Sequence, residues 1–253
     1  SKFIEYNNIT LFFPFENHNL SLNKNSAIIT TICKHYENRL EEWIQYSLKL
    51  GFSAIVIFNN DENTKNPINE AKLKEPIKKT KEICDKFKDK VLCIDFPYSP
   101  LGDDHWNQIQ RITLHLGIHG FKDQCRNICT IDPDEFIYFP RKTDNNIEEF
   151  LSHYNTTIQI QSNILTNRGE YDNIDNNVLQ IAKWIGPDKY KKLIYITSEV
   201  KHCQFIYSPH EVYINGTVLE VNTIEKDVLI HYHCWINKRC KWDKKFKYFD
   251  ILE

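Results

Sequence analysis

Two aspartates one residue apart, Asp132 and Asp134, are the residues of this chain best suited to chemistry. They follow an apolar run at 127–131, which is typical of a buried strand. Two carboxylates that leave a strand together can turn into one crevice and bind Mg²⁺ or Mn²⁺, ions that keep positions open for substrate phosphates. An acidic turn that only ends the strand is the alternative. We favour the metal site, because ligands of open α/β sheets bind beyond the carboxyl ends of strands.

Two histidines, His231 and His233, end another apolar run, at 228–230. The alternation of side chains along a strand places both imidazoles on the same side. One of them could complete the metal site, with Mn²⁺ the better match because it accepts nitrogen more readily than Mg²⁺. The alternative is a pair of surface histidines on an edge strand.

Polar residues that could bind a nucleotide follow the first two predicted strands. Lys34 and Glu37 come after the first strand, although the solvated start of a helix explains them equally well. Asn59 and Asn60 come after the second strand, where an amide could bond a base or a ribose and where an ordinary polar turn is the alternative. Arg111 lies on the helix before the aspartate pair and could reach a diphosphate.

The positions of these candidate residues depend on an alternating series of predicted strands and helices. Apolar runs of strand length occur at 26–31, 52–58, 91–96 and 127–131. Helical spacing separates them, and Gly51 stands where a glycine commonly ends a helix. The series predicts an α/β fold with a mostly parallel sheet and helices on both faces.

The pattern changes after Pro140 to shorter strands at 157–161, 193–197, 204–208 and 228–232. We interpret this part as a smaller, mixed subregion packed on the first, since no stretch has the composition of a flexible tether. The prediction is therefore one domain over 1–253, with its first half at about 26–140 and its second at about 141–253.

Composition narrows the classes of function. A net charge of −2 over 253 residues argues against a nucleic-acid binder that relies on positive charge. No run of about 18 apolar residues is present, so we expect no membrane span. The eight cysteines include no CxxC pair, and we expect reduced thiols in a cytoplasmic compartment. A module of a longer chain, a viral one included, is compatible with the same pattern.

The order of several short motifs resembles a GT-A glycosyltransferase of the family 2 and family 92-like type. The resemblance runs from about 27 to 235, most of the chain. In order, its motifs are TICK at 31–34, LEEWIQY at 40–46, IFNN at 57–60, IDPDEF at 131–136, YSPH at 207–210 and HY at 231–232. This sequence departs from the family at His35 and Tyr36, where the family has Asn-Glu, and at Asn59, where it has Asp.

The resemblance implies a GT-A fold, a Rossmann-like central sheet with an acceptor-side subregion at about 141–253. It also implies that Asp132 and Asp134 hold Mn²⁺ or Mg²⁺, with His231 as the third ligand. The acidic residue of the first turn is displaced to Glu37. The residues expected to contact the nucleotide-sugar are Thr31, Lys34, Glu37, Asn59, Asn60, Arg111 and Asp132.

The activity expected from the resemblance is sugar transfer from a nucleotide-diphosphate sugar, with a UDP-sugar favoured, to a hydroxyl of a glycan or another acceptor. An inverting reaction needs a carboxylate as general base, and Glu170 or Asp172 is the expected one. A degenerate GT-A domain that binds sugar or protein without turnover is the main alternative. Two other enzyme classes fit less well. A sugar nucleotidyltransferase would need a glycine-rich loop after the first strand, which this sequence lacks. A haloacid-dehalogenase-type phosphatase would need its aspartates after the first strand, whereas here they follow about the fourth.

Overall fold

The structure is a computed structural model of the chain. It describes residues 2–6, 9–13, 18–34, 36–60, 79–96, 105–141, 146–167, 177–200, 210, 213–214, 217–218, 221–236 and 246–249.

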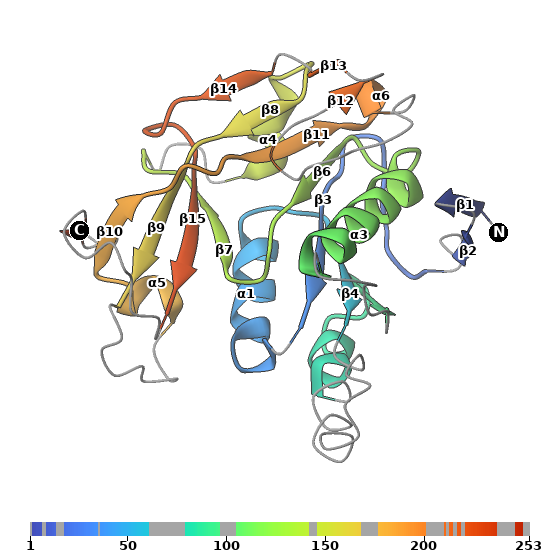
Figure 1. The fold of residues 1–253 in the computed structure, drawn as a ribbon, viewed down its shortest axis with the longest axis horizontal. Coiled ribbons are helices and arrows are strands. Elements are labelled where there is room, and N and C mark those ends of the chain that lie inside the picture. Colours follow the sequence, from blue (N-terminus) through green and yellow to red (C-terminus); the bar gives the residue numbers. More distant parts are fainter. Residues whose placement is uncertain are drawn as a thin grey trace.

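Four neighbouring parallel strands form one side of a seven-stranded sheet (Figure 1). Their order in the sheet is β5 (Val91–Asp95), β4 (Ala54–Asn59), β3 (Ala27–Cys33) and β6 (Asn127–Thr130). The chain thus moves outward from β3 to β5 and then returns to place β6 on the other side of β3. A doubly wound sheet has this order, and the point where the order reverses lies here at the carboxyl ends of β3 and β6.

Three strands from beyond residue 140 extend this sheet past β6. They are β11 (Lys192–Ile196), β8 (Ile158–Ile160) and β14 (Asn222–Ile224). Strand β11 runs antiparallel to both β6 and β8, whereas β14 runs parallel to β8. The predicted α/β class with a mostly parallel sheet is confirmed, and the second part of the chain shares that sheet with the first.

A second sheet of five strands begins immediately after the aspartate pair. Its order is β16 (Lys247–Tyr248), β10 (Trp184–Pro187), β9 (Ser162–Thr166), β15 (Ile230–Trp235) and β7 (Glu135–Tyr138). Residues 131–134 connect β6 of the first sheet to β7 of the second, so the two aspartates lie where the sheets meet (Figure 1).

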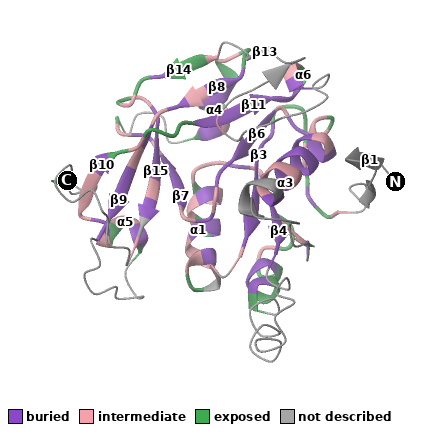
Figure 2. Ribbon diagram, viewed as in Figure 1, coloured by how far each residue is buried: buried purple, intermediate pink, exposed green. Residues whose placement is uncertain are grey.

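Helices cover both faces of the first sheet because successive strand residues point to opposite sides. Ile28 and Ile32 pack in the cluster that buries α3 (His105–Phe121). Ala27 and Ile29 pack in the other cluster, which buries one side of α1 (Glu37–Lys49) and of α4 (Ile147–Ser152). Figure 2 shows strands β3, β4 and β6 coloured as buried along their length.

The remaining elements are short. They are helices α5 (Val178–Ile181) and α6 (Thr197–Val200), the hairpin of β1 (Lys2–Tyr6) with β2 (Ile9–Phe13), and the hairpin of β12 (Tyr213–Ile214) with β13 (Thr217–Val218). The strand predicted at 204–208 lies outside the described residues. In the ranges given above, no helix is long and apolar enough to cross a membrane.

Gly51 ends α1 with a φ of +104°, as the sequence predicted for a helix-terminating glycine. A Cβ at this position would also lie 2.8 Å from the side chain of Asn146, which caps α4. We expect Gly51→Ala to lower the free energy of unfolding by about 1–2 kcal/mol, because an L side chain disfavours positive φ. Urea unfolding measures this loss, with exposed Lys90→Ala as the control. An unchanged midpoint for Gly51→Ala would show that this turn relaxes without cost.

Candidate functional site

The turn that carries the aspartate pair is held from three directions. Its own backbone closes it, since the Glu135 amide donates to the Asp132 carbonyl over 3.0 Å. The Trp43 indole of α1 donates to the Glu135 carbonyl over 2.7 Å, and the Cys234 amide of β15 donates to the Asp134 carbonyl over 2.8 Å. The turn is therefore fixed by the first helix and by the second sheet together.

The Glu135 carboxylate is the centre of this arrangement. Its Oε2 accepts from the Asp132 amide at 2.8 Å, lies 2.8 Å from Lys192 Nζ and lies 3.3 Å from His231 Nε2. All three side chains, Glu135, Lys192 and His231, are buried. Burial alone would raise the pKa of Glu135, but Lys192 and His231 outweigh it and hold that pKa well below the usual range. A buried ion pair thus anchors the turn.

The two histidines of β15 take different places. His231 is buried, with Nδ1 2.7 Å from Ser162 Oγ and Nε2 near Glu135. His233 has its Nε2 3.6 Å from Asp134 Oδ2. Both rings lie on the side of the aspartate turn, as predicted, but the structure brings His233 rather than His231 to Asp134. The register of β15 on β7 explains this, because His233 pairs with Glu135 at the start of β7 and His231 pairs deeper, with Ile137.

A hollow of about 180 Å³ opens beside Asp134. It lies at the carboxyl end of β3, next to the start of α1. Tyr36 contributes its phenol, whose pKa is raised by burial and by the nearby Asp134 charge. The lining residues are Ile32, Lys34, Tyr36, Asp132, Pro133, Asp134 and His233.

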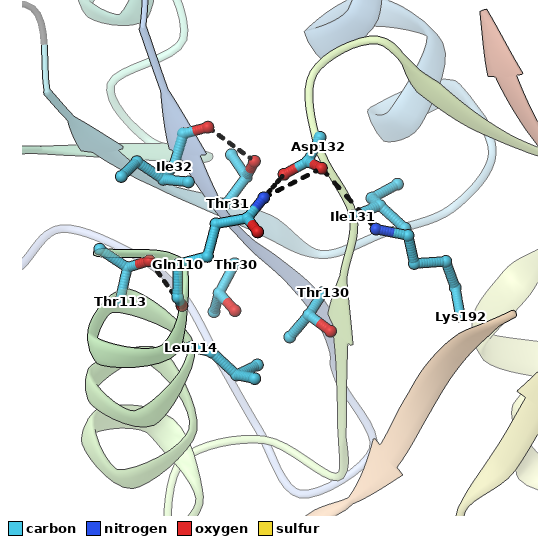
Figure 3. Close-up of a pocket in the computed structure, with 10 residues that line it drawn as sticks. All are labelled: Thr30, Thr31, Ile32, Gln110, Thr113, Leu114, Thr130, Ile131, Asp132 and Lys192. Atoms are coloured by element: carbon cyan, nitrogen blue, oxygen red, sulfur yellow. Dashed lines mark hydrogen bonds and ion pairs between the residues drawn. The ribbon is translucent and has the colours of Figure 1, made fainter. Parts of the chain in front are cut away.

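The Asp132 carboxylate is directed to other partners. Gln110 Nε2 of α3 lies 3.3 and 3.4 Å from its two oxygens, and Lys192 Nζ lies 3.7 Å from Oδ2 (Figure 3). Burial raises the pKa of Asp132 to about 6, against the influence of Lys192. Beside it is a small hollow of about 30 Å³, also lined by Thr30 and Thr130, whose hydroxyls have no hydrogen-bond partner within the described part of the chain. That space is enough for about one water.

Two side chains at the larger hollow are separated as two ligands of one divalent cation would be. In the described residues, no three His, Cys, Asp or Glu side chains are grouped closely enough to hold a metal. Asp134 Oδ2 and His233 Nε2, however, lie 3.6 Å apart at the edge of the larger hollow. Two ligands at about 2.1 Å from one cation are about 3.0–4.2 Å from each other, depending on the angle between them. Mn²⁺ suits this mixed oxygen and nitrogen pair, with its other positions left to water or phosphate.

The residues predicted to bind a nucleotide are distributed along the carboxyl edge of the sheet. Lys34 lines the larger hollow and Thr31 the smaller one, with the buried Thr31 hydroxyl donating to the Ile32 carbonyl over 3.4 Å. Asn60 is committed to the fold, since its Nδ2 donates to the Phe96 carbonyl over 2.7 Å. Asn59, at the end of β4, is 3% exposed, and both polar atoms of its amide lack a hydrogen-bond partner in the ranges that the structure describes.

Other predicted residues are not brought to the site or lie outside the description. Arg111 is partly buried on α3 and lines neither hollow. Glu37 is the first residue of α1, and its side chain is not described. Glu170 and Asp172, the expected general bases, lie outside the described residues, so that role stays a prediction.

Two residues of the site were missed by the sequence analysis. Lys192 begins the apolar strand KLIYI, and a lysine that opens a fully buried strand was a usable signal, because a buried ammonium requires an acidic partner. Asp188 follows β10 and has its Oδ2 3.9 Å from His233 Nδ1. It lies in a polar loop, and nothing in its local sequence distinguishes it.

Comparison with the models of known protein families gives no match, and no curated protein matches the sequence.

Lys192→Met removes the ammonium that neutralises the buried Glu135 carboxylate and that also lies beside the partly exposed Asp132. We expect a loss of about 3–5 kcal/mol in the free energy of unfolding at neutral pH, because the buried Glu135 carboxylate loses the ammonium that balances its charge. Chemical denaturation measures it, and the exposed neighbour Lys191→Met is the matched control. The double variant Lys192→Met/Glu135→Gln should recover part of the loss. Equal stability of the Lys192 and Lys191 variants would contradict an anchoring role for this pair.

Proposed function

We propose that this protein is a metal-dependent glycosyltransferase of the GT-A type that moves a sugar from a nucleotide-diphosphate sugar to a hydroxyl of a glycan or another acceptor. The observation that carries the proposal is the position of Asp134 and His233. Asp134 Oδ2 and His233 Nε2 lie 3.6 Å apart at the carboxyl edge of a doubly wound sheet, where the strand order reverses. Both residues line a hollow that Lys34 and Tyr36 also line.

The metal in this proposal is Mn²⁺, with Mg²⁺ as the alternative. Asp134 and His233 would hold it directly, and Asp132 would join them if its carboxylate exchanged Gln110 for the cation. A divalent cation bound there would offset the negative charge that builds on a departing nucleoside diphosphate. His231 is not needed in this set, because its ring is enclosed between Ser162 and Glu135.

The chain's own groups support binding of the diphosphate and of the nucleoside. Lys34 supplies an ammonium on the wall of the hollow, beside the two carboxylates. Asn59 lies one strand away, in register with Cys33. A buried amide without a partner is costly unless a ligand satisfies it, and an amide can both donate to and accept from a pyrimidine. A UDP-sugar is therefore the donor that we propose.

In the proposed reaction the protein would act mainly by orienting its substrates and by holding the Asp134 charge in a fixed position. The turn is fixed by Glu135, Trp43 and Cys234, so that Asp134 is preorganised before any ligand binds. Such preorganisation lowers a barrier because the charges do not have to rearrange during the reaction. The acceptor hydroxyl would lose its proton to a carboxylate, for which Glu170 and Asp172 remain our prediction.

A second function, ligand binding without turnover, is favoured by one observation. Gln110 and Lys192 already contact Asp132, so only Asp134 of the aspartate pair would join His233 in holding a cation. A cation held by fewer carboxylates favours binding without turnover.

Release of UDP from UDP-sugars in the presence of Mn²⁺ and an acceptor separates the two functions. A protein that binds UDP but releases none from any UDP-sugar would be a binding module.

Thermal unfolding with UDP, GDP, TDP and CMP, each with and without Mn²⁺, tests the proposal directly. We expect a rise in melting temperature with UDP that depends on Mn²⁺, since a ligand at 100 times its dissociation constant adds about 2.7 kcal/mol of stability. Asp134→Asn should abolish the Mn²⁺ dependence, whereas the exposed carboxylate variant Asp89→Asn should keep it. The proposal would be wrong if no nucleotide raised the melting temperature, or if Asp134→Asn responded as the parent protein does.

A further inference from the structure

His233 lies between two carboxylates, one at each nitrogen of its ring. Its Nε2 is 3.6 Å from Asp134 Oδ2, and its Nδ1 is 3.9 Å from Asp188 Oδ2. The imidazole is three-quarters buried, with 25% of the side chain exposed. One nitrogen thus faces the hollow beside the aspartate turn, and the other faces Asp188.

Strand pairing explains how Asp188 reaches this place. Strand β9 is the common neighbour of β10 and β15 in the second sheet. It pairs Asn163 with Pro187, the residue before Asp188, and pairs the adjacent Ile164 with His233. The side chains of Asp188 and His233 are therefore brought together by the register of β10 and β15 on β9, although the two residues are far apart in sequence.

The Asp188 carboxylate is held in position and is nearly enclosed. Its Oδ1 accepts from the Tyr190 amide over 3.0 Å, which leaves Oδ2 directed at His233. Only 5% of the side chain is exposed. A buried carboxylate is stable only where hydrogen-bond donors or positive charge surround it.

We infer that Asp188 is a positioning residue for metal binding: it fixes the His233 ring so that Nε2 presents its lone pair to a divalent cation shared with Asp134. The inference rests on the proposed function, from which it takes the metal. A histidine that binds a metal through one ring nitrogen commonly donates the other N–H to a carboxylate, which sets the tautomer, orients the ring and makes the ligand more basic. Asp188 is the carboxylate at that nitrogen; its Oδ2 is 3.9 Å away, longer than a hydrogen bond, so the inferred donation would form as the ring turns to meet the cation. Asp188 neither touches the cation nor takes part in the transfer.

Mn²⁺ binding to the whole chain tests this role, with calorimetry and electron paramagnetic resonance as readouts that need no turnover. We expect Asp188→Asn to weaken Mn²⁺ binding by 10–100-fold, the range for loss of such a partner. Asp188→Glu should restore most of the affinity, and the exposed Asp89→Asn should leave it unchanged. Circular dichroism of each variant verifies the fold, and Asp188→Ser provides a second variant if Asp188→Asn does not fold.

A spectroscopic signature distinguishes positioning from general destabilisation. Spin-echo modulation by imidazole nitrogen should be present in the parent protein with Mn²⁺, absent in His233→Ala and diminished in Asp188→Asn. Equal affinity and equal modulation in Asp188→Asn and the parent would overturn the role of Asp188 and leave the proposed function intact. Absence of Mn²⁺ binding in the parent would instead overturn the metal site of the proposed function, and the inference with it. Unchanged Mn²⁺ affinity with lost UDP release in Asp188→Asn would make Asp188 part of the catalytic machinery, contrary to this inference.

Discussion

The buried carboxylate of Glu135 is the constraint on which the rest of the site depends. It binds Lys192 from the first sheet, His231 from the second sheet and the backbone of Asp132 in the turn between them. A charge in the interior is tolerated only when its partners are all present, so the three segments that supply them have to meet in one arrangement. The geometry of the aspartate turn follows from that requirement.

The side chains around the Glu135 carboxylate fall into a buried set and a set that borders the hollow. Glu135, Lys192 and His231 are internal and hold the turn, whereas Asp134 and His233 are partly exposed and border the hollow. Asp132 lies between the two sets, bonded to Gln110 and close to Lys192. The acidic residues of the DPDEF segment therefore have different surroundings: Glu135 is buried and holds the turn, Asp134 borders the hollow, and Asp132 lies between them.

The fold places these residues at the carboxyl ends of β3 and β6. The parallel strands β3 and β6 end next to each other where the strand order reverses, and a crevice forms there without any special loop. The second sheet closes one side of that crevice, because β7 continues directly from the turn and β15 pairs with it. Asp188 and His233 belong to this second layer, which is why the site draws on both parts of the chain.

Sequence pattern alone was enough to predict the four parallel strands and their order along the chain, but not most strands of the second sheet. The apolar runs gave β3, β4, β5 and β6 close to their observed bounds, and Gly51 ended the first helix as expected, since these are local properties of spacing and backbone freedom. Alternation also placed His231 and His233 on one side of a strand. Which histidine meets Asp134 depends on the register between β15 and β7, and local sequence does not fix the register of distant strands. Lys192 and Asp188 were found only in the structure because their partners are distant in sequence. A contact between distant residues produces no periodic pattern along the chain.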